Sequence, residues 1–297
     1  MGHIANLRQA VRRDKTIQDP LLNRLGLQVG RTIAAHAIAR VRRWDGPDDP
    51  VVAGWVDTLR RDGCVEIPDF LDPADLTLVA DAARDCLARD VRRDEMDQGG
   101  NHLELIWRDD VPQARRADLD RFFLHPGVLA LASAAERILV EPGAGRCHVQ
   151  HLVQRKGEPD IQAAIHSDTF HPTHKVWLYL TDVSEDDGPL VYYPGSHRLG
   201  ISTLRAIYRE SNAENAGSRR LDEAEVARRG LAARSFTCPA NTLVVADTCG
   251  YHGRVQGRPP GSRTALHMEL RPPPFRRSRR LRADHPVSAA SRRAAVG

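Results

Sequence analysis

The residues of this chain best suited to chemistry lie in the run AIHSDTF, residues 164–170. His166 and Asp168 stand two positions apart, so on a β-strand both side chains project from the same face. An imidazole beside a carboxylate makes two-thirds of a facial triad of two histidines and one carboxylate, which binds Fe(II) and leaves adjacent coordination positions open. Such a pair alone is a weak signal in a chain with thirteen histidines. His252, which follows the strongly apolar run TLVVAD, is the candidate third ligand.

Arg263 is the candidate anchor for a carboxylate. It lies eleven residues beyond His252, within the β-like run RTALHMEL. A guanidinium inside a barrel is costly unless it meets an anion, and its planar fork matches a carboxylate bidentately. A dicarboxylate that chelates a metal at one end needs such an anchor at the other. Arg254 and Arg258 compete for this role, but they lie in a Gly/Pro-rich loop, and we favour Arg263.

Short β-like runs separated by turns must position these side chains. Strands at this spacing, punctuated by Gly and Pro, favour a sandwich or barrel. Residues 200–235 interrupt the pattern with a charged stretch that is expected to be a helical insertion. The β-like runs are CHVQHLVQ, KVWLYLTDV, PLVYYPGS, TLVVADT and RTALHMEL.

The first half of the chain is expected to supply mainly helices. A short strand is predicted within residues 62–71, and Asp72 can cap a helix that begins at Pro73. A second helix is expected over about 126–140. Residues 1–44 also have a helical pattern, with apolar residues every four positions, although Gly26 and Gly30 weaken it.

Charge is segregated along the 297 residues. Residues 1–44 carry nine basic and two acidic side chains, and residues 271–297 carry eight arginines and one aspartate, so the body between them is acidic. Packing of the first segment on the domain is favoured over contact with anionic lipid. The basic tail has too few large apolar residues to fold and is expected to be disordered. No apolar run suits a spanning helix or a signal peptide, and five scattered cysteines indicate a reducing cytoplasm.

The sequence resembles the phytanoyl-CoA dioxygenase-like family of Fe(II)/2-oxoglutarate oxygenases from about residue 55 to 275. HSDTF followed by KVWLYLTDVSEDDGPLVYYPGSH is its most specific block, and YHGRVQGRPPGSR matches the distal histidine and the downstream arginine. LRRDGCVEIPDFLDPADLTLV and VQHLVQRK match the earlier strands and helix. The resemblance implies a double-stranded β-helix (jelly roll, cupin-like), mainly β with flanking helices.

The resemblance also implies roles for individual residues. His166, Asp168 and His252 would ligate iron, and Arg263 would bind the distal carboxylate of 2-oxoglutarate. Gln150 matches a glutamine that often faces the co-substrate or substrate, and Trp177 occupies an aromatic position near the site. Asp187 stands where asparagine is common, in a turn expected to be structural. Because Asp168 is present, hydroxylation or desaturation is favoured over halogenation.

The remaining histidines are assigned by their place in the expected strands. His148 shares a face with Gln150, whereas His151 points the other way. His171 and His174 follow the metal motif, but Pro172 breaks the strand register, so they are not expected to be ligands.

These observations predict three segments and an oxygenase. The segments are a basic helical extension (1–44), the oxygenase domain (45–275, with the insertion at about 200–235) and a basic tail (276–297). The enzyme would use Fe(II), 2-oxoglutarate and O2 to hydroxylate a small, anionic substrate. An acidic sugar, including the Kdo type found in glycolipid, and a biosynthetic metabolite are the leading classes.

Two alternatives come from other classes of protein. One is a catalytically inactive jelly roll that binds a metal or ligand, and the other is a nucleic-acid binder that uses the arginine-rich tail. The strands show no aromatic platform interleaved with basic residues, so no specific nucleic acid is expected. The location is expected to be cytoplasmic, with contact at the inner membrane through the basic ends as a further hypothesis.

Overall fold

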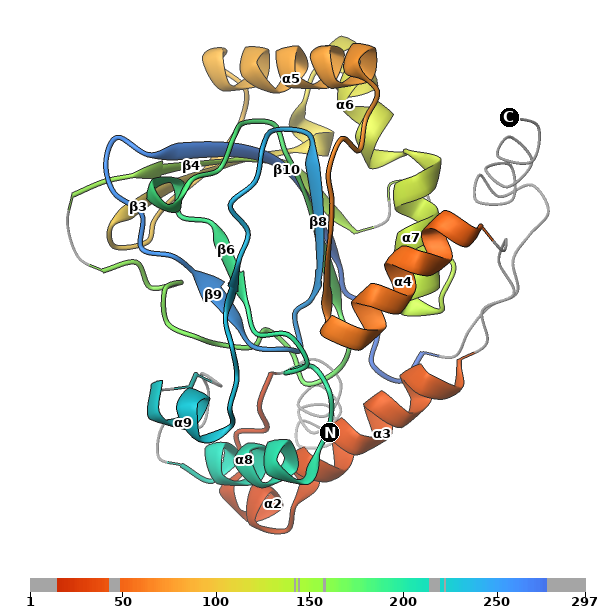
Figure 1. Cartoon of the computed structure of the whole chain (residues 1–297), viewed down its shortest axis with the longest axis vertical. Coiled ribbons are helices and arrows are strands. Elements are labelled where there is room, and N and C mark those ends of the chain that lie inside the picture. The colour runs from red at the N-terminus through yellow and green to blue at the C-terminus, as the bar shows by residue number, and fades with distance from the viewer. Residues whose placement is uncertain are drawn as a thin grey trace, which may run out of the picture.

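The fold consists of two antiparallel sheets with helices packed around them (Figure 1). This computed structural model describes residues 15–42, 49–141, 143, 145–156, 159–213, 220–221 and 223–276. The expectations for residues 1–14 and for the tail from 277 to 297 therefore lie outside the described residues. Among the residues that are described, no helix is long and apolar enough to cross a membrane.

The larger sheet has seven strands and the smaller sheet has three, and every neighbouring pair is antiparallel. This two-sheet arrangement is the jelly roll expected from the sequence. The larger sheet has the order β1 (Cys64–Ile67), β8 (Thr242–Asp247), β5 (His174–Tyr179), β10 (Ser262–Leu270), β4 (Arg146–Gln154), β3 (Asn101–Trp107) and β2 (Asp94–Asp97). The smaller sheet has the order β7 (Arg234–Ser235), β6 (Leu190–Tyr192) and β9 (His252–Arg254).

Alternation along the long strands separates the core from the site. On β10, Leu266 and Met268 belong to the main hydrophobic core, whereas Arg263 and His267 line a cavity between the sheets. On β4, Val149 faces the same core, and its neighbours in the sequence face the cavity. Because side chains alternate strictly on a strand, one sheet carries the stabilising apolar face and the polar functional face together.

Four helices cover the apolar face of the larger sheet: α4 (Pro50–Asp62), α5 (Pro73–Ala88), α6 (Gln113–Phe123) and α7 (Pro126–Glu136). Asp72 accepts hydrogen bonds from the N–H groups of Ala74 and Asp75, and Pro73 opens α5, as the sequence indicates. The second helix, expected over about 126–140, ends at Glu136, because Arg137 after it adopts a left-handed conformation at φ 49°. Two short 3-10 turns, Arg108–Asp110 and Glu185–Asp187, precede α6 and β6.

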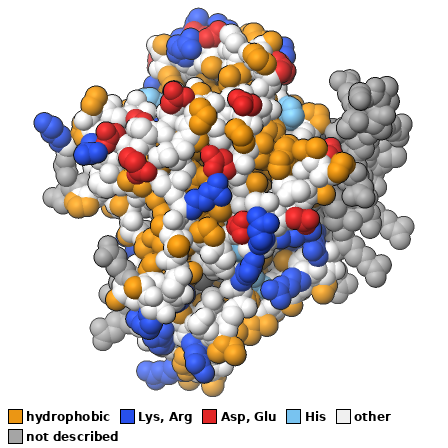
Figure 2. All heavy atoms as spheres, in the orientation of Figure 1, with side chains coloured by type: hydrophobic (Ala, Val, Ile, Leu, Met, Phe, Trp, Pro, Cys, Tyr) orange, Lys and Arg blue, Asp and Glu red, His pale blue; other side chains and the backbone are white. Residues whose placement is uncertain are grey.

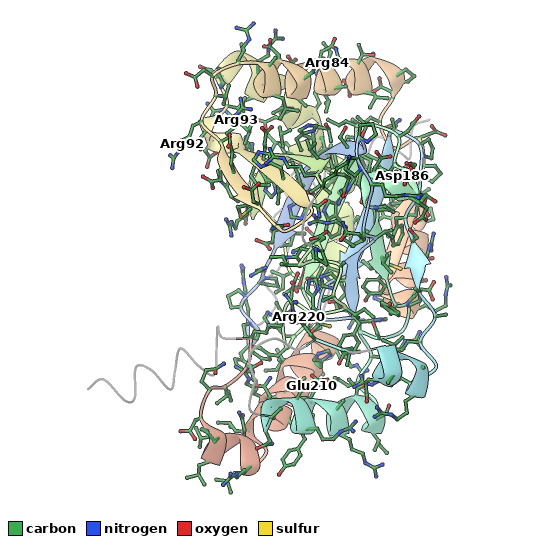
Figure 3. The ribbon with its side chains drawn as sticks, turned by 90° about the vertical axis from the view of Figure 1, so that its left-hand side faces the viewer. Arg84, Arg92, Arg93, Asp186, Glu210 and Arg220 are labelled. Atoms are coloured by element: carbon green, nitrogen blue, oxygen red, sulfur yellow. The ribbon has the colours of Figure 1, made fainter. Side chains whose placement is uncertain are left out.

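The other helices gather at the opposite end of the molecule from α5 (Figure 1). Figure 3 shows the same separation from the side, with Arg84 of α5 at one end and Glu210 of α8 at the other. These helices are α2 (Pro20–Arg24), α3 (Leu27–Val41), α8 (Ile201–Ser211) and α9 (Glu223–Arg228). The charged stretch at 200–235 thus contains two helices and, at its end, the short strand β7.

The N-terminal segment packs on the domain, but through polar side chains. Gly26, at φ 82°, separates α2 from α3. Arg31 is buried, with its guanidinium 3.9 Å from the ring centroid of Phe170, and Gln28 accepts a hydrogen bond from the Ile17 N–H. Leu25, by contrast, is 75% exposed. The four-residue apolar pattern therefore does not mark the buried face, because specific polar contacts decide which side of α3 meets the domain.

Asn241 joins the start of β8 to the segment before α5. Its amide donates to Leu71 O (2.8 Å) and accepts from Leu71 N–H (2.9 Å), and its backbone is left-handed at φ 67°. We expect Asn241→Ala to lower the free energy of unfolding by about 2–4 kcal/mol, because it loses two buried hydrogen bonds and strains the backbone. Asn241→Gly should cost less, since glycine tolerates this φ. Urea unfolding measures both, and equal losses would contradict the strain component.

Candidate functional site

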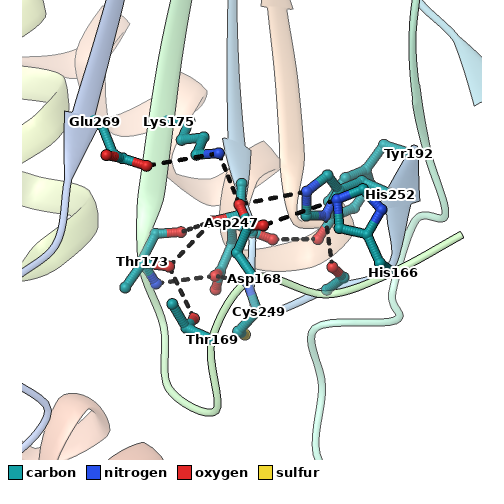
Figure 4. Close-up of polar contacts among 12 residues, drawn as sticks. His166, Asp168, Thr169, Thr173, Lys175, Tyr192, Asp247, Cys249, His252 and Glu269 are labelled. Atoms are coloured by element: carbon teal, nitrogen blue, oxygen red, sulfur yellow. Dashed lines mark hydrogen bonds and ion pairs between the residues drawn. The ribbon is translucent and has the colours of Figure 1, made fainter. Parts of the chain in front are cut away.

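Two histidines from distant parts of the chain are paired through their backbones. The His166 N–H donates to His252 O, and the His252 N–H donates to His166 O, both at 2.9 Å. The pairing brings the two ring centroids to 4.5 Å. Asp168 is fixed beside them because its N–H donates to Thr248 O at 2.8 Å (Figure 4). His166, Asp168 and His252, here called the trio, offer donor atoms that all lie within 4.8 Å of one another.

Backbone carbonyls set the orientation of both imidazoles. His166 Nδ1 lies 2.8 Å from Ala164 O, and His252 Nδ1 lies 3.0 Å from Gly250 O. This leaves Nε2 of each ring toward Asp168, at 3.8 Å for His166 and 3.5 Å for His252. Metal-binding histidines are usually held in this way, by a hydrogen bond from the ring nitrogen that does not face the metal. Burial and the neighbouring His252 lower the pKa of His166 to about 4, so the ring is neutral, as a metal ligand must be.

Lys175 on β5 contacts the carboxylate of the trio, a contact that the sequence did not indicate. Its Nζ lies 2.8 Å from Asp168 Oδ2 and 3.7 Å from Glu269 Oε1 (Figure 4). Burial alone would raise the pKa of Asp168, but Lys175 and His252 outweigh it and hold this pKa well below its ordinary value. Asp168 therefore stays ionised, and the donor set of two neutral imidazoles and one carboxylate fits a divalent metal such as Fe(II).

The trio opens into a cavity of about 350 Å³ between the two sheets. Gln150, Trp177 and Arg263, which the sequence singled out, all line it. The β2–β3 hairpin, which the sequence analysis did not predict, supplies a further wall with Met96, Gln98, Leu103, Leu105 and Trp107. The alternation of apolar and polar residues in LELIW, residues 103–107, could have predicted the strand β3 from the sequence.

Three arginines competed for the role of carboxylate anchor, and their surroundings differ. Arg258 is largely exposed and pairs with Asp186 at 2.6 Å, away from the cavity. Arg254 lines the cavity but pairs with Asp160 at 3.3 Å. Burial, followed by the neighbouring charge of Arg263, lowers the pKa of Arg254 to about 10.

Arg263 keeps a donor available inside the cavity. It is buried, its Nε donates to Gly188 O at 3.0 Å, and its Nη1 has no hydrogen-bond partner among the described residues. Its guanidinium carbon lies 5.5 Å from the ring centroid of Tyr179, whose buried hydroxyl also has no partner within that part of the chain. This arrangement suits a ligand carboxylate better than the paired Arg254 does.

The other histidines near the motif are occupied elsewhere. His171 Nε2 lies 3.1 Å from Pro272 O, and His174 Nδ1 lies 2.6 Å from Glu136 Oε1. Neither belongs to the trio. His148 lines the cavity as its strand position predicted, whereas His151 bonds Thr264 on the other face. Asp187 accepts from Ser184 and from the Ser262 N–H, which makes its turn structural.

Comparison with known proteins gives one family and several similar structures. The model of the phytanoyl-CoA dioxygenase (PhyH) family matches residues 59–234. The non-heme alpha ketoglutarate dependent epimerase SnoN from nogalamycin biosynthesis is 18% identical, with a TM-score of 0.52, and the match covers 76% of this chain and 87% of that one. SnoN in complex with Fe3+, alpha ketoglutarate and nogalamycin RO has a TM-score of 0.51 at 18% identity, covering 80% and 98%. At this identity the likeness shows the fold. No curated protein sequence matches the chain.

We expect the trio to bind a divalent metal in a 1:1 ratio. His166→Ala and Asp168→Ala should each abolish tight binding of Mn(II) or anaerobic Fe(II) in titration calorimetry, because each removes one of the three convergent donors. His171→Ala is the matched control, since this buried histidine lies outside the trio and should leave metal affinity unchanged. Retention of wild-type affinity by Asp168→Ala would contradict the assignment.

Proposed function

The chain belongs to the phytanoyl-CoA dioxygenase family, and from this premise we propose that it is an Fe(II)/2-oxoglutarate-dependent oxygenase that hydroxylates a C–H bond of a small, anionic substrate. The observation that carries the proposal is the trio, in which two oriented, buried imidazoles and an ionised carboxylate converge. The carboxylate also supports oxygen transfer over halogenation, since it fills the position that a halide would need.

Different residues of the chain would bind the metal, the co-substrate and the substrate. When bound, iron and 2-oxoglutarate supply the oxidation by O2 of a C–H bond, with succinate and CO2 as co-products. The trio would hold the metal, and Arg263 would take the distal carboxylate of 2-oxoglutarate, next to the hydroxyl of Tyr179. Gln150 and Trp177, which share the cavity wall, would face the co-substrate or the substrate.

The charges of the cavity support an anionic substrate. Its lining includes four cationic side chains, Arg146, Lys175, Arg254 and Arg263, against the carboxylates of Asp168 and Glu269. Fe(II) and 2-oxoglutarate carry opposite charges of the same size, so binding both leaves this cationic excess in place. Arg146, 65% exposed at its side chain, is the cation best placed to meet an incoming acid group. An acidic sugar or an anionic biosynthetic metabolite is therefore the proposed substrate class.

A cytoplasmic location is part of the same proposal. All five cysteines are free and buried, as expected for a protein that works under reducing conditions.

We expect Arg263→Ala to raise the KM for 2-oxoglutarate at least about tenfold, because a hydrogen bond to a charged group is worth about 1.5–3 kcal/mol. Succinate formation measured against 2-oxoglutarate concentration checks this. Arg258→Ala is the control and should leave the KM unchanged. If Arg254→Ala raises the KM more than Arg263→Ala does, the anchor is Arg254.

The reaction itself is tested by incubating the Fe(II) protein with 2-oxoglutarate, O2 and a panel of acidic sugars and metabolites. Mass spectrometry should find a product 16 mass units heavier, in equal amount to succinate. A product of unchanged mass formed with succinate would mean another oxidative outcome. Absence of succinate under all conditions, with metal bound, would favour the inactive binding protein.

A further inference from the structure

Four aromatic rings cross the wall of the cavity in a single row. Trp107, His148, His267 and Trp177 are direct cross-strand partners on β3, β4, β10 and β5. Their ring centroids follow one another at 4.8, 4.6 and 5.0 Å, and all four rings line the cavity. We call these residues the aromatic row. Neighbouring rings are tilted by 65°, 39° and 60°, and the first and last pairs have the edge-to-face packing that aromatic pairs prefer, so each ring is held by its neighbours.

The row runs from β5, the strand whose Lys175 contacts the trio, to the partly exposed Trp107 on β3. Trp177 at one end shares β5 with Lys175, two residues away, and Lys175 contacts Asp168. Trp107 at the other end lies on the hairpin and is partly exposed. A molecule that rests on the half of the row nearer Trp107 can therefore present an edge to the trio.

His148 has hydrogen-bonding groups that the described residues do not use. It is buried, and neither its Nδ1 nor its Nε2 has a partner among those residues. A buried polar group without a partner costs about 1–3 kcal/mol, so its position on the cavity wall points to a ligand. Burial lowers the pKa of His148 to about 3, which leaves a neutral ring with one donor and one acceptor.

We propose that Trp107 and His148 form the binding floor for the substrate and that the substrate carries a saturated, hydroxylated ring. The C–H face of such a ring packs on the aromatic floor, while a hydroxyl, which both donates and accepts, matches the neutral imidazole. Gln98, Gln150 and Gln162 add amide groups around the same cavity. A purely apolar ring would leave His148 unpaired.

Arg146 completes the site for a ring that also bears an acid group. Its guanidinium carbon lies 4.4 Å from the ring centroid of Trp107, and its nearest carboxylate, Glu269, is 3.7 Å away. The cation therefore lies over the Trp107 ring, at the floor itself, where it can meet an acid substituent of a bound ring. This inference rests on the proposed function, because it names the substrate class of the same site.

The test compares three monocarboxylates that differ in one respect each. D-Glucuronate has a ring and hydroxyls, cyclohexanecarboxylate has the ring without hydroxyls, and D-gluconate has hydroxyls without the ring. Calorimetric titrations use protein loaded with Ni(II) and saturated with 2-oxoglutarate, so the probes cannot occupy the co-substrate position. We expect glucuronate to bind at least about tenfold more tightly than either of the others, a difference of about 1.4 kcal/mol.

Two variants assign the effect to the floor. His148→Phe keeps a flat ring and should remove the preference for glucuronate over cyclohexanecarboxylate. Trp107→Leu should weaken both ring compounds while leaving gluconate unchanged. Failure of wild-type protein to bind glucuronate, equal binding of the three probes, or an unchanged preference in His148→Phe would overturn the proposal.

Succinate formed without substrate separates this proposal from the proposed function. If His148→Phe still makes succinate but has lost the ring preference, both proposals stand. If the wild-type protein binds glucuronate selectively but makes no succinate, the floor stands and the oxygenase fails. If it makes succinate but shows no ring preference, the oxygenase function is supported and the proposed binding floor is contradicted.

A separate observation concerns the surface between α3 and α8. An open groove of about 920 Å³ lies there, lined largely by apolar groups such as those of Val29, Ile33, Ile201 and Leu204. Ile201 is 71% exposed, and Leu25, next to the groove, is 75% exposed. Figure 2 shows apolar side chains beside basic ones at this end of the molecule.

The geometry points to an anionic lipid surface as the partner of this groove. Three arginines, Arg205, Arg209 and Arg228, line it. Glu225 pairs with Arg209 at 3.4 Å and with Arg228, so three cations meet one carboxylate and the rim keeps a positive excess. Apolar side chains within a basic rim match the interface of an anionic bilayer, where apolar burial and charge attraction add. The sequence suggested contact with the inner membrane through the basic ends. This proposal assigns such contact to the groove between α3 and α8.

Vesicle sedimentation tests the lipid surface. The protein should bind vesicles of phosphatidylglycerol, bind pure phosphatidylcholine several-fold less, and dissociate at high salt. Ile201→Glu should reduce binding at least about fivefold, since it places a charge at the apolar interface. Leu78→Glu is the control, because Leu78 is exposed on α5 at the other end of the molecule. No binding to phosphatidylglycerol, or equal binding by Ile201→Glu, would overturn the proposal.

Discussion

The backbone pair between His166 and His252 is the interaction on which the site depends. Two hydrogen bonds at 2.9 Å join residues 86 positions apart and link the segment before β5 to the smaller sheet. Because the pair fixes both backbones, the two imidazoles must lie side by side. Asp168, two residues from His166, then needs a single bond to Thr248 to complete the trio. The sheets are thus held together where the chemistry is placed.

The alternation of the long strands extends this order across the cavity. Each step of two residues along β10 gives one row of side chains on the inner face: Glu269 with Lys175 and Arg146, His267 in the aromatic row, Ala265 beside Gln150, then Arg263. Charged groups, aromatic groups and the arginine anchor therefore follow one another along β10. The opposite face of the same strand carries Leu266 and Met268 in the core. The cavity lining and the hydrophobic core therefore lie on opposite faces of the same strands, β3, β4, β5 and β10.

The sequence was enough for the parts of the site that depend on local spacing. Arg263 follows from strand periodicity, and the pairing of His166 with Asp168 follows from their motif, although both residues lie outside the strands and His166 forms only isolated bridges. The resemblance supplies the jelly roll. The sequence was not enough to predict elements and contacts that depend on partners distant in the chain. The strand β2, DEMD, has three acidic residues and one methionine, and it forms only because it pairs with β3. The buried polar face of α3 depends on Phe170, distant in sequence, and the contact of Lys175 with Asp168 likewise crosses between elements.

Several buried polar groups without partners among the described residues gather at the cavity. They are Arg263 Nη1, Tyr179 OH, both nitrogens of His148 and Nδ1 of His267. Each costs roughly 1–3 kcal/mol if left unpaired, which a bound ligand would recover. The first two lie where a carboxylate would be anchored, and the imidazoles lie on the aromatic row. Their separation implies two ligand positions, one for a co-substrate and one for the molecule on which the trio acts.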